Sequence, residues 1–179
     1  MRSPPAVNEI KELMLREPRL TLAVAESLTC GHLQAAVGAI SGASEFFLGG
    51  LTAYTLAQKV RHLGVERAAA EPVNSVSAEI AEQMARGACA AFGSDLGLAT
   101  TGYAEPAPER GVTAPMAFWA LAHRRPDNTL VLRHGRVERP GAARTAMQAA
   151  AAAAALAALV DYLRALRGGA TESAGSPRP

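Results

Sequence analysis

The feature that most constrains the fold is an apolar segment that passes without a break into a helical one, LTLAVAESLTCGHLQAAV at residues 20–37. Residues 20–25 are apolar at nearly every position, which indicates a strand buried on both faces. Residues 31–37 return to helical spacing through Leu33, Ala36 and Val37. A strand that runs directly into a helix is typical of α/β sheets, in which ligand sites form where the strands end.

The rest of the chain repeats this alternation of strand-like and helix-like patterns. Gly64 follows a helical segment as a C-cap, and Ser77 precedes another as an N-cap. The turn-forming cluster HRRPDN joins the last two strands as an antiparallel hairpin. The further strands are predicted at residues 45–55, 96–101, 115–122 and 129–136, and the helices at 7–16, 56–64, 78–92 and 142–166. We therefore predict an α/β fold, a three-layer α/β/α sandwich around a mixed sheet of about five strands.

The length of 179 residues suits one domain with a substantial core. We predict a single domain over residues 1–167 and a disordered tail, GGATESAGSPRP, over residues 168–179. Alanine is abundant and only 4% of the residues are aromatic, so small aliphatic side chains are expected to build the core.

The charge and the apolar tracts predict the partners and the compartment. The 18 basic and 16 acidic residues are spread along the chain without a basic run, so no nucleic-acid partner is expected. The alanine-rich tract at residues 149–160 is shorter than the ~20 apolar residues of a membrane span, so no membrane is expected. Two cysteines, and an N-terminus with prolines and charges instead of a signal sequence, predict a cytoplasmic protein.

Three residues near the predicted strand ends have side chains suited to hydrolysis. Ser27 follows the first strand, and a serine hydroxyl becomes a nucleophile only beside a base. Lys59 can be that base if burial lowers its pKa, and Tyr54 lies five residues before it. On residue types alone, a capping Ser27, a solvated Lys59 and a packed Tyr54 remain the alternative.

Three motifs, AESLTCG at residues 25–31, SGASEFFLGGLTAYTLAQKVRHLGV at 41–65 and VSAEIAEQMARGA at 76–88, stand in order along the chain. Together they resemble the C-terminal domain of the CinA (competence-damage-inducible) family, whose stand-alone members are nicotinamide-nucleotide amidohydrolases. The resemblance covers roughly residues 7–166. It implies an α/β/α fold with a mixed sheet and hydrolysis of nicotinamide mononucleotide to nicotinic acid mononucleotide and ammonia.

The resemblance also assigns roles to individual residues. Ser27 matches the family's nucleophile, Lys59 its proposed base and Tyr54 the tyrosine beside them. Backbone N–H groups at residues 28–31 are expected to face the developing oxyanion, as at a helix N-terminus. No metal or other cofactor is implied, and a homodimer or larger homo-oligomer is expected. Substrate contacts are expected from Glu26, Thr29, Cys30, Gly31, Thr101, Gly102, Arg110 and Arg144.

The chain departs from the family pattern mainly in the loop TGYAEPAPERG at residues 101–111, which replaces a glycine-rich loop. Prolines supply no N–H group and the carboxylates of Glu105 and Glu109 repel a phosphate. Cys30 replaces a glycine and is either a second nucleophile or a packed thiol. Arg139 and Arg144 are both candidates for the family's arginine near the start of the last helix.

Three functions follow from this pattern. The first is a hydrolase that acts on nicotinamide mononucleotide or a related amide, a small-molecule substrate of the pyridine-nucleotide type. The second is a binding or regulatory paralogue that has lost turnover because its ligand loop is rebuilt. The third is an amidase for a substrate without a phosphate. A metal site is not expected, because the cysteines and histidines show no ligand spacing beyond Cys30 and His32.

Overall fold

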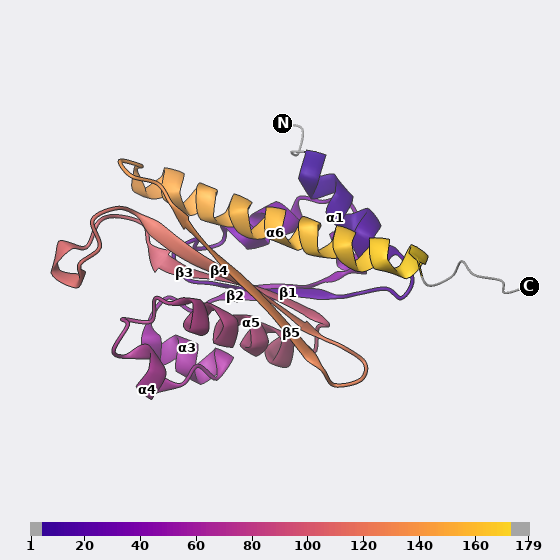
Figure 1. The fold of residues 1–179 in the computed structure, drawn as a ribbon, viewed down its shortest axis with the longest axis horizontal. Helices are drawn as coiled ribbons and strands as arrows, with labels where there is room; N and C mark the ends of the chain where they lie inside the picture. The colour runs from indigo at the N-terminus through magenta and orange to yellow at the C-terminus, as the bar shows by residue number, and fades with distance from the viewer. Residues whose placement is uncertain (1–4, 173–179) are drawn as a thin grey trace, which may run out of the picture.

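The computed structural model describes the backbone of residues 5–172 and the side chains of residues 9–168. Within these residues one five-stranded sheet has the order β2-β1-β3-β4-β5 (Figure 1). β1 pairs in parallel with both of its neighbours, whereas β3, β4 and β5 pair antiparallel. The strands are β1 (Leu22–Glu26), β2 (Phe47–Thr52), β3 (Leu96–Tyr103), β4 (Met116–Arg124) and β5 (Leu130–Glu138). The predicted mixed sheet of five strands is confirmed.

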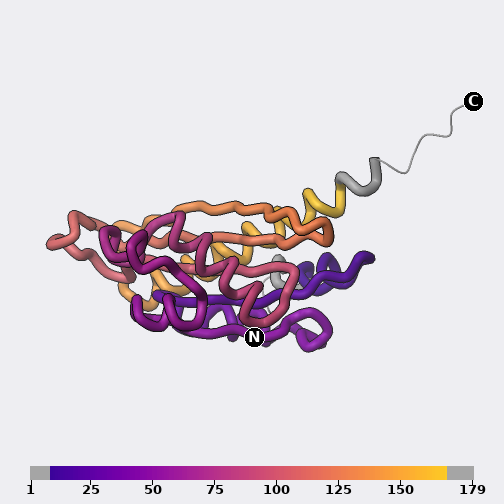
Figure 2. The backbone as a smooth tube through the Cα atoms, turned by 90° about the horizontal axis from the view of Figure 1, so that it is seen from below, coloured from indigo at the N-terminus to yellow at the C-terminus, as the bar shows by residue number. Residues whose placement is uncertain are grey.

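Helices cover both faces of the sheet (Figure 1). One face carries α1, α2 and α6, and the other carries α3, α4 and α5. In Figure 2, α1 and the yellow turns of α6 lie towards one end of the molecule, and the loop after β3 extends from the opposite end. The helices are α1 (Pro5–Leu15), α2 (His32–Gly38), α3 (Leu56–Leu63), α4 (Arg67–Ala70), α5 (Ala78–Phe92) and α6 (Arg144–Glu172). This is the predicted three-layer α/β/α arrangement.

Alternation along β1 divides the core between the two layers. Leu22 and Val24 belong to the cluster with α1, α2 and α6, while Ala23 and Ala25 belong to the cluster with α5. The α5 side is built from small residues, which lets the helix lie close to the sheet. A Cβ atom at Gly97 would collide with the carbonyl oxygen of Ala85, so only glycine permits this approach. The prediction of a core of small aliphatic side chains is confirmed on this face.

Several element boundaries differ from the sequence predictions. The strand predicted at residues 45–55 is shorter, Phe47–Thr52, because a 3₁₀ turn at Ala43–Glu45 precedes it. The four-residue helix α4 was not predicted, since four residues carry no periodicity. The caps at Gly64 and Ser77 are confirmed: Gly64 has φ 64°, and the Ser77 hydroxyl accepts a hydrogen bond from Ile80 N (3.1 Å).

The last helix is longer than predicted and runs from Arg144 to Glu172. The first residues of the predicted tail are therefore helical, and residues 173–179 lie outside the described part of the chain. By length and composition the segment Arg144–Gly168 could cross a membrane, contrary to the expectation from residues 149–160. One side of it, which includes Met147, Leu159 and Leu163, is buried in the core of the domain.

Candidate active site

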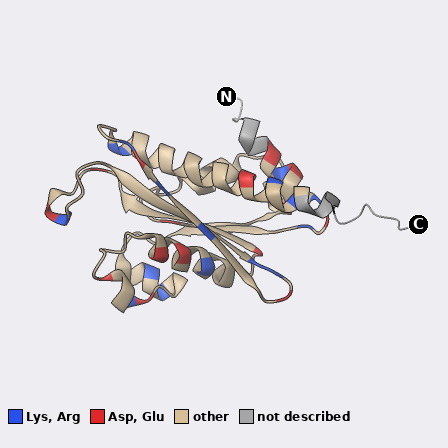
Figure 3. Cartoon of the chain, in the orientation of Figure 1, with Lys and Arg blue, Asp and Glu red and all other residues tan. Residues whose placement is uncertain are grey.

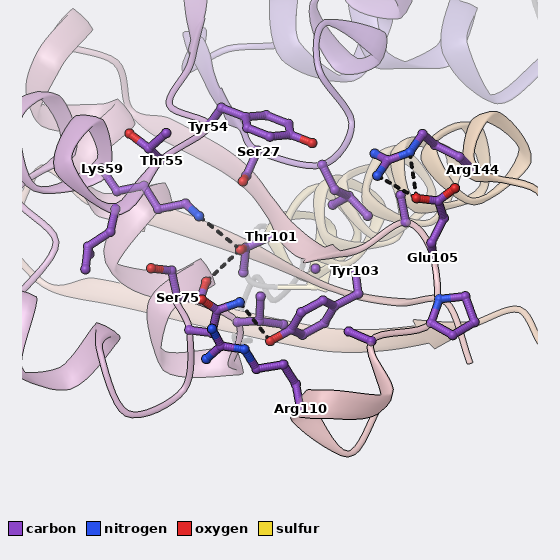
Figure 4. A pocket seen from close by; sticks show the side chains of 18 of the residues that line it. Ser27, Tyr54, Thr55, Lys59, Ser75, Thr101, Tyr103, Glu105, Arg110 and Arg144 are labelled. Carbon is purple, nitrogen blue, oxygen red and sulfur yellow. Dashed lines mark hydrogen bonds and ion pairs between the residues drawn. The ribbon is translucent and has the colours of Figure 1, made fainter. Parts of the chain in front are cut away.

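A pocket of about 550 Å³ opens at the carboxyl ends of β1 and β3 (Figure 4). Ser27 follows the last residue of β1, and Thr101 and Gly102 lie at the end of β3. Lys59 reaches the same pocket from α3, and Tyr54 reaches it from the segment between β2 and α3. Because β1 is parallel to both β2 and β3, the residues that follow these strands meet at one edge of the sheet.

Ser27 is held by its backbone while its hydroxyl is left available. Its N–H donates to the carbonyl of Thr100 (3.1 Å), which continues the pairing of β1 with β3. The side chain is buried, with 6% exposed, and lines the pocket. Its Oγ atom makes no hydrogen bond to any described residue, including the Lys59 amine. Figure 4 shows both groups facing the same pocket.

The Lys59 amine is buried in the wall of this pocket. Only 3% of the residue is exposed, and no carboxylate of the described residues forms an ion pair with it. Its Nζ donates to the hydroxyl of Thr101 (3.5 Å), which in turn donates to the carbonyl of Ser75 (2.7 Å). Burial lowers the pKa of the amine from 10.5 to about 8, because the charged form loses its hydration. The neutral amine, which can accept a proton, is thus accessible near physiological pH.

The turn after β1 leaves two N–H groups unused. The N–H groups of Leu28 and Thr29 make no hydrogen bond to the described residues. The other two groups predicted to face an oxyanion are occupied: Cys30 N donates to Ser27 O, and Gly31 N donates to a carboxylate oxygen of Glu26. The predicted set of donors at residues 28–31 is therefore reduced to two, of which Leu28 lines the pocket.

Four predicted substrate contacts do not line the pocket: Glu26, Thr29, Cys30 and Gly31. Glu26 is fully buried and caps α2, where its carboxylate accepts from the N–H groups of Gly31, Leu33 and Gln34 (2.9–3.1 Å).

Thr29 shares a buried hydrogen bond with Thr100 (2.7 Å), and Cys30 is exposed outside the pocket. These residues form and brace the turn that presents Ser27. The structure thus places these residues in the turn that presents Ser27 and outside the wall of the pocket.

The mouth of the pocket carries charges from two elements. Arg144, the first residue of α6, donates from Nε and Nη2 to one oxygen of Glu105 (3.1 and 2.8 Å). The pKa of its guanidinium is raised, first by Glu105 and then by the Tyr54 hydroxyl. Tyr54 itself is 53% exposed. Arg110 also lines the pocket. Of the two candidates for the family's arginine, Arg144 lines the pocket and Arg139 does not.

Sequence reasoning missed the contribution of the loop before α5. Asn74 and Ser75 line the pocket, and both have positive φ angles, 51° and 61°. This backbone turns the Ser75 carbonyl toward Thr101, and the Asn74 amide donates to the Tyr103 hydroxyl (3.0 Å). Adjacent asparagine and serine favour such a left-handed turn, so the segment EPVNSVS was enough to predict the shape of this loop. The segment did not indicate that the loop lines the pocket.

Known proteins of one family resemble this chain. A competence-damaged protein (CinA) superfamily protein from Escherichia coli superposes with a TM-score of 0.74 and 27% identity over 88% of both chains. The competence damage-inducible protein A from Klebsiella pneumoniae gives 0.77 and 28% over 88% of this chain and 94% of that one.

Among curated sequences, a CinA-like protein from Picosynechococcus sp. is 43% identical over 115 residues, which is 64% of this chain and 27% of that protein. A putative competence-damage inducible protein from Moorella thermoacetica is 46% identical over 93 residues, 52% of this chain and 22% of that protein. The chain thus spans about a quarter of the length of these relatives. The CinA C-terminal domain model matches residues 6–163, most of the chain. The chain belongs to the CinA C-terminal domain family.

Proposed function

We propose that this protein is an amidohydrolase in which Ser27 is the nucleophile and Lys59 the base. The observation that carries the proposal is the presence, in one pocket, of a serine hydroxyl that makes no hydrogen bond to the described residues and a buried amine whose pKa is about 8. A serine and a lysine in such surroundings are the components of a hydrolytic pair that needs no histidine.

The reaction follows from the positions of these groups. Neutral Lys59 takes the proton of Ser27 as Oγ forms a bond to the amide carbon, and the carbonyl electrons move to the oxygen. We assign the stabilisation of this oxyanion to the N–H of Leu28, a pocket residue whose N–H makes no hydrogen bond to the described residues. When the intermediate collapses, the carbon–nitrogen bond breaks and Lys59 returns the proton to the leaving ammonia. Water, deprotonated by the same amine, then hydrolyses the ester and the proton passes back to Ser27.

Release of ammonia from a panel of carboxamides tests the proposal. Nicotinamide mononucleotide, nicotinamide riboside and nicotinamide present the same amide with and without a phosphate and a ribose. We expect ammonia from at least one of them, with a rate that rises as pH passes through about 8, because Lys59 then loses its proton. Refusal of the whole panel would contradict the proposal and favour the binding paralogue.

An amide without a phosphate is the second candidate substrate. The Glu105 carboxylate already forms an ion pair with Arg144. Glu71 and Glu109 add two more carboxylates to the pocket wall. Pro106 also lines the pocket and offers no N–H group to an anion. A neutral or cationic group therefore suits this end of the pocket better than a phosphate does.

Substituting Glu105→Gln tests which substrate the pocket prefers. The neutral side chain cannot hold Arg144 as an ion pair, so the guanidinium becomes available to a phosphate. We expect kcat/KM for nicotinamide mononucleotide to rise about tenfold, or ~1.4 kcal/mol, with little change for nicotinamide riboside. Glu109→Gln is the matched control, because it removes a carboxylate from the same wall without releasing Arg144. Equal gains in both variants would contradict a specific role of the Glu105–Arg144 pair.

A further inference from the structure

A second cavity, of about 510 Å³, lies at the opposite end of the sheet from the candidate active site. Leu20 and Asp95, which precede β1 and β3, line it together with His123 near the end of β4. The last turns of α6 complete it through Leu166 and Arg167. The proposed hydrolase uses none of these residues.

Positive charge dominates this cavity. Figure 3 shows basic residues on α1, towards the end of α6 and in the β4–β5 hairpin, with acidic residues among them. Five arginines line the cavity against the carboxylates of Glu17 and Asp95, which leaves a formal excess of three positive charges. The Asp95 carboxylate already accepts from the N–H and hydroxyl groups of Thr21 (2.8 and 2.6 Å). The arginines are Arg16, Arg19, Arg124, Arg125 and Arg167.

One of these arginines is buried without a counterion. Arg167 is 9% exposed and donates to the backbone carbonyls of Leu13, Glu17 and Pro18 (3.1, 3.5 and 3.0 Å). No carboxylate of the described residues pairs with it, and burial followed by the charge of Arg16 lowers its pKa. An anion that enters the cavity would therefore stabilise this buried cation electrostatically.

Two further arginines are free to bind such an anion. Arg16 and Arg125 are exposed, and neither side chain forms an ion pair or a side-chain hydrogen bond with the described residues. A guanidinium binds phosphate and carboxylate through two parallel hydrogen bonds and also stacks on flat rings. The cavity thus has unoccupied donors at its rim.

The walls between the arginines are apolar. Pro18, Leu20, Pro126 and Leu166 supply them. His123 is buried beside them, and its Nδ1 shares a hydrogen bond with the Tyr162 hydroxyl (2.7 Å). Burial, followed by the charge of Arg125, lowers the pKa of the His123 ring, which keeps it uncharged at neutral pH. These walls suit a ring-sized apolar body.

We propose that this cavity binds a small organic anion in which a phosphate monoester is carried on a flat heterocyclic body. The phosphate lies between Arg16 and Arg125, and the ring packs against the leucines and prolines. The site is separate from the hydrolytic pocket, although α6 contributes to both through Arg144 and Arg167. Along the helix these two residues are about 35 Å apart, at ~1.5 Å per residue.

Titration calorimetry with adenosine monophosphate, adenosine and inorganic phosphate tests the proposal on the whole chain. We expect adenosine monophosphate to bind at least tenfold more tightly than adenosine or phosphate alone, because only it has both parts. Arg125→Gln and Arg16→Gln should each weaken binding about tenfold. Both side chains are exposed and have no partner among the described residues, so neither change should lower the melting temperature.

Two control variants locate the bound anion. Arg110→Gln removes a cation from the hydrolytic pocket, and Arg133→Gln removes an exposed one from β5. We expect both to bind adenosine monophosphate as the unaltered protein does. Loss of affinity in Arg110→Gln, retention of it in Arg125→Gln, or binding of phosphate alone with equal strength would each overturn the proposal.

Discussion

Lys59→Met is expected to make the protein more stable while it removes turnover. The pKa of this lysine falls from 10.5 to about 8 on folding, so keeping it protonated at pH 7 costs on the order of 3 kcal/mol of folding free energy. Methionine has a similar length and no charge, and it would pack where the lysine stem now lies. We therefore expect the free energy of unfolding to rise by about 1–3 kcal/mol.

The lowered pKa of Lys59 also predicts how the stability of the protein changes with pH. Between about pH 8 and 10.5 the unfolded chain binds a proton at Lys59 that the folded protein has released. The stability of the unaltered protein should therefore rise with pH across this window, and Lys59→Met should lack that rise. Urea unfolding at pH 7 and pH 10 measures both effects.

Lys11→Met is the matched control, because Lys11 is the chain's only other lysine. It lies on α1 and forms an exposed ion pair with Glu45 (2.8 Å). An exposed pair contributes ~0–1 kcal/mol, so this variant should be slightly less stable and fully active. Lower stability of Lys59→Met would contradict the desolvation of the amine, and retained turnover would contradict its role as the base.

Ser27→Ala is expected to lower kcat by about 1,000-fold or more for any amide that the protein hydrolyses, because no other described group replaces the nucleophile. The Oγ atom makes no hydrogen bond to the described residues, so its loss should change the free energy of unfolding by less than about 0.5 kcal/mol. A large loss of activity at unchanged stability separates a chemical role from a structural one.

Cys30→Ser serves as the comparison for this variant. Cys30 lies three residues after Ser27, is exposed and is outside the pocket. We expect it to keep its activity. Ammonia release that survives Ser27→Ala and disappears in Cys30→Ser would assign the nucleophile to the thiol and contradict the proposed mechanism.

Local patterns in the sequence were enough to predict the elements that carry the site. The apolar run before Glu26 predicted β1, and the helical pattern over residues 78–92 predicted α5. Glycine and serine at helix ends predicted the caps at Gly64 and Ser77. Sequence patterns did not predict the hydrogen bonds of the Glu26 carboxylate. This carboxylate caps α2, and the geometry depends on how β1 enters the turn.

The sequence by itself determined the order of strands and helices, the mixed α/β class and the family, because periodicity, turn residues and motifs depend on neighbours along the chain. Only the tertiary structure decided that Lys59 is buried without a counterion among the described residues, that Arg144 pairs with Glu105, and that arginines from three parts of the chain surround one cavity. Burial and electrostatic potential depend on which distant segments pack together, and so they set the pKa of a side chain only once the chain is folded.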